Sequence, residues 1–478
     1  MKRHCRQRSA RRLLRTLVIF ASVMAASPNA AVAQPFEAIV SLNSYANGDD
    51  ADDGAVAIAT DGRGRWVAVW ETLHALGRKT PERRWNIAFS VSTDDGRSWS
   101  AAALLAPGRS AGATMDTSPA IATDRRGVWV VAFQSAGVVK GSPGSDSDVL
   151  WARSDDDGAS WSAPQPVALD AGDEFRPALA FAGNAWLLGW EGQARELGGG
   201  GDGDLVVSRS TDGARTWSAP ALLTETAKND AGVDRRLVLA VEGAGERVLA
   251  GWEAFSVPGL GSDWDVMVAR SDDAGASWSA AQPLSARAAS DGHAGDDSVS
   301  LAAAGDGRWL ALWASYVGKP GDEEDDWDIM AAASSDGGKT WSSAASVNGP
   351  FKTDTHRDLL PRVAFDGAGR FVAVWTSKDS MGKTKGSDSD VLVSVSTDDG
   401  RTWSPPRAVA AYATADGRSW DDKPVVVSDG KGLVLVAWSG NHNLEGRTGT
   451  DGDLRVVGLP KAPPATASAP APPLAIPR

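Results

Sequence analysis

The chain has 478 residues, and its 61 Asp and Glu outnumber its 48 Lys and Arg, which gives a formal net charge of −13. An acidic chain of this kind is a poor partner for nucleic acid or an anionic membrane surface, because both carry negative charge themselves. Cys5 is the only cysteine, so the sequence excludes a disulfide framework and a cysteine-ligated metal site.

Residues 1–33 have the order of segments found in a secretory signal peptide. Seven Lys and Arg with no acid among them precede an apolar run at residues 17–26, and Ala31, Val32 and Ala33 form a small-x-small cleavage signature. The apolar run is well short of the about 20 residues that a membrane-spanning helix needs. We therefore expect cleavage near Ala33 and a secreted or periplasmic bacterial protein with no membrane span.

Two motifs repeat along the rest of the chain. A Ser-x-Asp motif that ends in tryptophan occurs six times, and a pair of apolar strands joined by a glycine-containing turn occurs seven times. Both recur about every 60 residues, which is the size of a supersecondary unit rather than of a helical period. The Ser-x-Asp copies begin at Ser92, Ser154, Ser210, Ser271, Ser334 and Ser396. The paired strands each carry a landmark aromatic residue, namely Trp70, Phe133, Trp190, Trp252, Trp313, Trp375 and Trp438.

Each unit predicts four strands, because alternating apolar positions are interrupted only by Gly- and Asp-containing turns. Four-stranded units repeated at a fixed spacing are typical of a β-propeller. The seventh unit has no fourth strand of its own, and residues 35–44 resemble the missing one. We therefore expect an all-β, seven-bladed β-propeller with four-stranded blades over residues 34–460, closed by the N-terminal strand and monomeric. The Pro/Ala-rich residues 461–478 predict a disordered tail.

The Ser-x-Asp motif predicts a folded turn between the third and fourth strands of a blade. Asp and Ser side chains accept hydrogen bonds from loop N–H groups, glycine takes a positive φ, and the tryptophan packs on the blade. A calcium loop fits the motif poorly, because each turn has too few carboxylates. The third copy has Ala214 in place of the glycine. The six copies resemble the Asp box (bacterial neuraminidase repeat, BNR) of the sialidase superfamily, whose Asp boxes lie on the propeller face away from the active site.

The resemblance implies either a sialidase or a relative without its activity. Sialidases have six blades, hold the substrate carboxylate with three arginines, and use a tyrosine–glutamate pair as nucleophile with an aspartate as acid/base. This chain departs from the pattern with seven units, no Arg-Ile-Pro element in its first unit, and only three tyrosines, Tyr45, Tyr316 and Tyr412. A six-bladed sialidase fold and exo-sialidase activity stay open as alternatives.

The candidate catalytic residues occupy equivalent positions in neighbouring units. Arg176 and Arg236 stand at the start of first strands, and Glu191 and Glu253 follow the second strands of the same two units. Two arginines beside two glutamates could bind a sugar carboxylate and carry acid/base chemistry, or they could form ordinary surface ion pairs. Tyr316 and Tyr412, in connections expected on the functional face, complete this set of candidates.

An acidic residue precedes every first strand at the same offset, which predicts a ring of carboxylates around the channel mouth. These acids could cap loop N–H groups and hold neighbouring blades together, bind a cation, or accept the hydroxyl groups of a sugar. Asp53, Asp116 and Asp296 are the best metal-ligand candidates because no basic residue follows them two positions on. Calcium is thus the one cofactor that the sequence suggests. The ring consists of Asp53, Asp116, Glu174, Asp234, Asp296, Asp358 and Asp421.

Four tryptophans, Trp85, Trp264, Trp327 and Trp420, could stack on sugar rings at the same face, or could simply be packed. We therefore expect an exported propeller that binds a glycan or a cell-surface or periplasmic protein. An exo-glycosidase of sialidase type and a periplasmic assembly or scaffold factor are the alternatives, and the sequence leaves enzymatic activity undecided.

Overall fold

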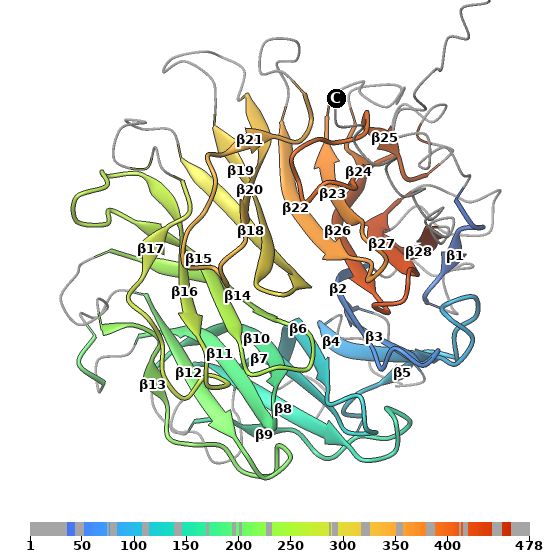
Figure 1. Ribbon diagram of the computed structural model, residues 1–478. Coiled ribbons are helices and arrows are strands. Elements are labelled where there is room, and N and C mark those ends of the chain that lie inside the picture. Colours follow the sequence, from blue (N-terminus) through green and yellow to red (C-terminus); the bar gives the residue numbers. More distant parts are fainter. Residues whose placement is uncertain are drawn as a thin grey trace, which may run out of the picture.

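The protein is an all-β, seven-bladed β-propeller, in which seven sheets of four antiparallel strands are arranged around one axis (Figure 1). The computed structural model describes residues 36–43, 52–73, 76, 84–107, 114–137, 146–168, 172–193, 197–199, 203–225, 232–285, 288, 295–316, 326–349, 357–378, 388–410, 413, 419–441 and 452–459. The predicted signal peptide and the predicted tail lie outside these residues. Over the described ranges, no helix is long and apolar enough to cross a membrane.

The four strands of a blade follow one another in the chain, except in the seventh blade. The first strands are β2 (Asp53–Thr60), β6 (Thr114–Thr123), β10 (Glu174–Ala182), β14 (Asp234–Val241), β18 (Asp296–Gly305), β22 (Asp358–Phe365) and β26 (Asp421–Ser428). The second strands are β3 (Trp66–Thr72), β7 (Trp129–Gly137), β11 (Ala185–Gly192), β15 (Val248–Phe255), β19 (Arg308–Tyr316), β23 (Phe371–Ser377) and β27 (Val434–Gly440).

The outer half of each blade consists of a long third strand and a short fourth strand. The third strands are β4 (Asn86–Ser92), β8 (Ser147–Ser154), β12 (Asp204–Ser210), β16 (Trp264–Ser271), β20 (Trp327–Ser334), β24 (Asp390–Ser396) and β28 (Asp453–Leu459). The fourth strands are β5 (Ala103–Leu104), β9 (Gln165–Pro166), β13 (Ala221–Leu222), β17 (Gln282–Pro283), β21 (Ala345–Ser346), β25 (Arg407–Ala408) and β1 (Val40–Ser41).

The propeller has two distinct faces. The first strands of neighbouring blades pack on one another around the ring. Because adjacent strands are antiparallel, the first and third strands of each blade begin at one face, which we call the loop face. They end at the other, which we call the turn face. The turn face carries the six Ser-x-Asp turns, and the ring acids lie at the loop face, each within two positions of the start of its strand.

The N-terminal strand closes the ring, as the sequence predicts. β1 pairs with β28 in the order β1-β28-β27-β26, with Val40 opposite Val456. The N–H of Leu42 then donates to the carbonyl of Leu454 at 3.0 Å. The alternative of a six-bladed fold is therefore wrong, because the chain forms seven four-stranded sheets and its two ends share one of them.

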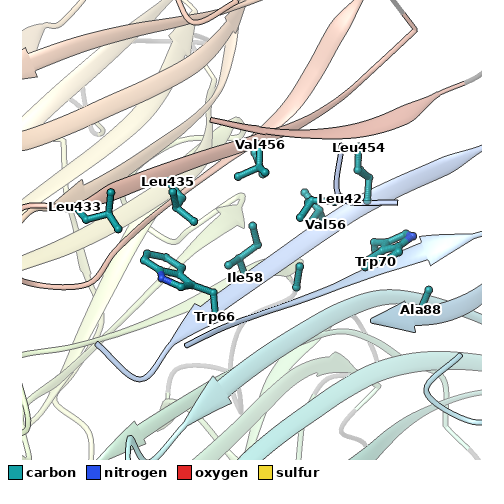
Figure 2. Close-up of a cluster of buried hydrophobic side chains, with 12 residues drawn as sticks. Leu42, Val56, Ile58, Trp66, Trp70, Ala88, Leu433, Leu435, Leu454 and Val456 are labelled. Carbon is teal, nitrogen blue, oxygen red and sulfur yellow. The ribbon is translucent and has the colours of Figure 1, made fainter. Parts of the chain in front are cut away.

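A buried apolar cluster seals the junction between the last blade and the first (Figure 2). Leu42 from the N-terminal segment, Trp66 and Trp70 from the first blade, and Leu435 and Leu454 from the seventh are all at most 2% exposed. Tryptophan side chains bury a large apolar area, so this junction resembles the core of a domain rather than a loose contact.

The Ser-x-Asp motifs form compact turns, as predicted. In the first copy, Asp94 accepts hydrogen bonds from the N–H and the hydroxyl of Ser98 at 2.9 and 2.6 Å. Gly96 has a φ of 79°, and a Cβ there would lie 2.5 Å from the Leu435 side chain of the neighbouring blade. Ala214 adopts the same conformation in the third copy, with a φ of 57°. The turns thus pack each blade against the preceding one.

Removal of residues 36–43 should lower the thermal unfolding midpoint in a single cooperative step, because the seventh blade loses its fourth strand and Leu42. Leu42→Ala alone should lower the free energy of unfolding by about 2–5 kcal/mol. Ala38→Ser, at an exposed position of the same segment, is the matched control and should change little. Circular dichroism melting curves test this, and an unchanged midpoint in the truncated protein would contradict closure by β1.

Candidate functional site

Each first strand contains a β-bulge close to its start, at the loop face. The register shifts so that two residues of the first strand oppose the one landmark aromatic of the second strand, as Arg176 and Pro177 oppose Trp190. The shift occurs at the same place in all seven blades. The first bulge residue always has a positive φ although none is glycine: Ala55 (38°), Ser118 (52°), Arg176 (45°), Arg236 (54°), Ser298 (61°), Leu360 (54°) and Lys423 (52°).

Three of these bulge residues are basic, namely Arg176, Arg236 and Lys423. A bulge bends its strand and re-aims a side chain, so the three cations sit at the loop face at the same position of blades 3, 4 and 7. A positive φ at a non-glycine residue costs about 1–3 kcal/mol and persists only where its surroundings hold it. The bulge is therefore a constant feature of the blades, and it fixes the backbone position from which these side chains extend.

Glutamates hold the bulges from the neighbouring blade. At three junctions, a glutamate directly after the landmark aromatic accepts the N–H of the bulge residue in the next blade, at 2.6 Å each time. Because of the bulge, this N–H is not hydrogen-bonded within its own sheet, and the carboxylate accepts its hydrogen bond instead. The three contacts are Glu71 with Ser118, Glu191 with Arg236, and Glu253 with Ser298.

The four Arg and Glu candidates lie in one connected chain across blades 3 to 5. Arg176 Nη1 is 2.6 Å from Glu191 Oε2, and Arg236 Nη1 is 3.2 Å from Glu253 Oε1. Arg236 Nη1 also contacts Asp297 of the next blade. The Arg176 and Arg236 side chains remain 53% and 39% exposed, whereas that of Glu253 is fully buried. The buried carboxylates thus hold the two arginine side chains in place, while a large part of each remains exposed to solvent.

Glu253 is the centre of this charged group. Its Oε2 accepts a hydrogen bond from Arg235 Nε at 2.7 Å, and the guanidinium of Arg235 lies 3.5 Å from the centre of the Trp264 ring. Burial, together with the hydrogen bond and charge of Asp297, raises the pKa of Glu253 to about 7. Burial also opposes ionisation of Asp297, but hydrogen bonds and the charge of Arg236 outweigh it and lower the pKa of Asp297. Their surroundings thus shift the pKa values of the two carboxyl groups in opposite directions, as in an acid–base pair.

Two further charged groups share this electrostatic environment. Arg362, on β22, has its pKa lowered by burial and next by the positive charge of Arg236. Burial raises the pKa of Glu71, although the N–H of Ser118 and the charge of Lys423 act against it. Arg362 is thus influenced by the charges of Arg236, Glu253 and Asp297, and Glu71 by the charge of Lys423.

The predicted metal ligands lie in the expected register near the start of their first strands and are buried. Asp53 and Asp296 begin β2 and β18, and Asp116 is the third residue of β6. Asp53 accepts a hydrogen bond from Asn43 Nδ2 at 2.6 Å, and Asp116 accepts one from Ser135 Oγ at 2.6 Å. Asp296 is 2% exposed. In the part of the chain that the structure describes, no three acidic, histidine or cysteine side chains are grouped so that they could hold a metal ion. Calcium at these acids stays a prediction.

Ring acids also join neighbouring blades. Asn43 Nδ2 donates to Asp53 of the first blade and, at 2.9 Å, to Asp453 of the seventh. Asn348 does the same between the fifth and sixth blades, donating to Asp328 at 2.7 Å and to Asp358 at 2.5 Å. These contacts agree with the expectation that the acids hold blades together.

The aromatic candidates are divided by the fold. Tyr316 ends β19 with its ring 5.8 Å from that of Trp327, and Tyr412 lies outside the described residues. The ring of Trp264 is covered by an arginine. Trp420, which immediately precedes the first strand of blade 7, is 37% exposed, so it offers an open aromatic surface at the loop face.

Sequence reasoning missed two residues of the charged group. Asp297 and Arg235 are the chain neighbours of Asp296 and Arg236, which the sequence did single out. Adjacent residues of a regular strand point to opposite faces, and the bulge breaks that rule by bringing Arg235 and Arg236 to the same glutamate. The second acid in the pair Asp296-Asp297 was the available signal.

No protein-family model matches this chain, and no curated protein does. Among solved structures, it is similar to a protein of unknown function from Dyadobacter fermentans, with 18% identity over 72% of this chain and 94% of that one and a TM-score of 0.44. It is also similar to the NanB sialidase of Streptococcus pneumoniae, with 11% identity, 89% and 70% coverage and a TM-score of 0.46. A GH93 α-L-arabinofuranosidase of Fusarium graminearum gives 13% identity, 88% and 97% coverage and a TM-score of 0.46. None of these likenesses bears on the chemistry of this chain.

Glu253→Gln should change how stability depends on pH. Because the pKa of Glu253 is raised from 4.5 to about 7, the folded protein binds this proton more tightly than the unfolded chain does. The stability that it contributes is present below the lower value and is lost as the pH rises to the upper one. Between about pH 5 and pH 8, the wild type should lose up to about 3 kcal/mol relative to the variant. Urea unfolding at both pH values measures this, with the exposed Glu246→Gln as control, and a constant difference between wild type and Glu253→Gln would exclude a raised pKa.

Calcium should raise the thermal unfolding midpoint if Asp53, Asp116 or Asp296 ligates it, because the ion would bind the folded state only. Asp116→Asn should then weaken the gain. Thermal unfolding with and without millimolar calcium is the measurement. A midpoint that does not respond would leave these acids as hydrogen-bond acceptors alone.

Proposed function

We propose that the protein is an exported, Asp-box-type propeller that binds a glycan, and that Arg176 and Arg236 hold a sugar carboxylate at the loop face. The observation that carries the proposal is the placement of two half-exposed guanidinium groups at the same bulge position of neighbouring blades, each anchored on a buried glutamate. Arginine is the side chain best suited to a carboxylate, because its planar fork donates two parallel hydrogen bonds.

The anchoring uses only part of each guanidinium. The side-chain contacts of Arg176 and Arg236 within the described chain go through Nη1, which leaves the donors on Nε and Nη2 of both groups for a ligand. Since the buried carboxylates fix the arginines beforehand, little side-chain entropy remains to be lost on binding. Trp420 supplies an exposed aromatic ring on the same face, of the kind on which sugar rings stack.

Isothermal titration of the protein without residues 1–33 should show tighter binding of a sialic acid-terminated oligosaccharide than of its neutral counterpart. Arg176→Gln and Arg236→Gln should each weaken binding about tenfold or more, since a hydrogen bond to a charged group contributes about 1.5–3 kcal/mol. Arg97→Gln, in a Ser-x-Asp turn on the opposite face, is the matched control. Equal affinity for acidic and neutral glycans, or full affinity in both arginine variants, would refute the proposal.

Glycoside hydrolysis is a second candidate function, favoured by the opposite pKa shifts of Glu253 and Asp297. A proton held on Glu253 and an ionised Asp297 would be the acid and the carboxylate that glycosidases require. Binding comes first because Glu253 is fully buried. Fluorogenic sialosides and arabinosides test the second candidate. Turnover that Asp297→Asn abolishes and Arg97→Gln preserves would select the enzyme, and binding without turnover would select the lectin-like function.

A further inference from the structure

A cavity opens at the turn face, at the far ends of the first strands. It has a volume of about 490 Å³ and is enclosed by the last residues of β2, β6, β10, β14 and β26 together with the turns that follow several of them. Its position therefore corresponds to the axis of the ring, seen from the side opposite to the charged group. Aliphatic and aromatic side chains line the well, among them Ile58, Ile121, Leu179, Phe181, Leu239 and Val427, and polar groups make up at least as much of its surface.

Three arginines stand at the rim of this cavity, on the turns of blades 1 and 2. Arg63 Nη2 donates to the carbonyl of Arg125 at 2.6 Å, which ties the two turns together. The N–H of Arg126 donates to Asp124 Oδ1 at 2.7 Å, so this lining acid is engaged in shaping its own turn. Lys431 adds a fourth cation, since its Nζ donates to the carbonyl of Gly62 in the neighbouring turn.

Acids also lie near the cavity, on the turns of blades 2 and 4. Glu246 is exposed on the turn of blade 4, and Glu242 is paired with Arg247 at 2.8 Å. The lining from blades 1 and 2 therefore has three exposed arginines and the half-buried Asp124, whereas the turn of blade 4 carries an exposed acid. The formal net charge of the chain is −13, so a cluster of positively charged side chains at the rim of the well differs in sign from the chain as a whole.

We propose that this cavity binds an amphipathic carboxylate, with the apolar body in the well and the carboxylate on the guanidinium groups of Arg63, Arg125 and Arg126. A volume of about 490 Å³ is within the range of small-molecule sites, which are mostly apolar with a few polar groups that fix orientation. A medium-chain fatty acid matches this division.

This site is separate from the proposed glycan site, although both use the same strands. Arg176 and Phe181 belong to β10, and five residues of extended chain separate them by roughly 16 Å. The two sites consequently lie at opposite ends of the ring axis, and substitutions at one should not alter ligand binding at the other.

Decanoate is a suitable probe, titrated calorimetrically into the protein without residues 1–33. We expect saturable binding at one site, with decanol and decyltrimethylammonium binding at least about tenfold more weakly, because each lacks the charge that the rim selects. The triple variant Arg63→Gln/Arg125→Gln/Arg126→Gln should lose about tenfold or more in decanoate affinity. Ala244→Trp, at an exposed position of the lining, should obstruct the well and weaken binding without disturbing the core.

Two controls make the test decisive. Arg97→Gln and Arg176→Gln should bind decanoate like the wild type, and the triple variant should keep any binding of acidic glycans. No saturable binding, equal binding of decanol, or full affinity in the triple variant would overturn the proposal. Decanoate binding that begins only after removal of residues 460–478 would also overturn it, because the chain itself would then be the occupant.

Discussion

The bulge opposite each landmark aromatic is the constraint on which the loop face depends. A tryptophan or phenylalanine in the second strand is matched by two residues of the first strand, and the first of these takes a positive φ. Its N–H leaves the strand ladder and is paired by a glutamate of the preceding blade at three junctions. One local irregularity thus sets blade packing, the direction of the basic side chains and the burial of the glutamates that anchor them.

The number of blades could be predicted from the sequence because Trp70 and its six counterparts repeat at every unit, whether or not a Ser-x-Asp turn follows. The missing fourth strand was equally visible as a gap in the last unit. The bulges were not. In a sequence, a positive φ is usually indicated by glycine. Here residues such as Ala55 and Leu360 occupy the first position of the bulge. Only the paired register of the two strands reveals it.

The charged group was predicted in part, for a related reason. Arg176, Arg236, Glu191 and Glu253 were visible because they repeat between two units. Asp297 has no such counterpart in the neighbouring unit, and its role depends on a contact with an arginine 61 residues earlier in the chain. The Asn43 bridge to Asp453 spans 410 residues, and no local pattern could have indicated it. Sequence patterns repeat within each blade and therefore predict the blade, whereas contacts between blades depend on how the ring closes.

Closure by β1 also fixes the order in which the molecule can be completed. The residues that pair with β28 are made before the first blade, and β28 itself is made after every other described strand. Until β28 has been made, the early segment therefore has no partner strand, and the seventh sheet is the last of the seven that can form. A nascent chain that stops after six blades would present an unpaired strand and an uncovered apolar junction. The pairing that stabilises the closed ring thereby requires that all seven blades have been made.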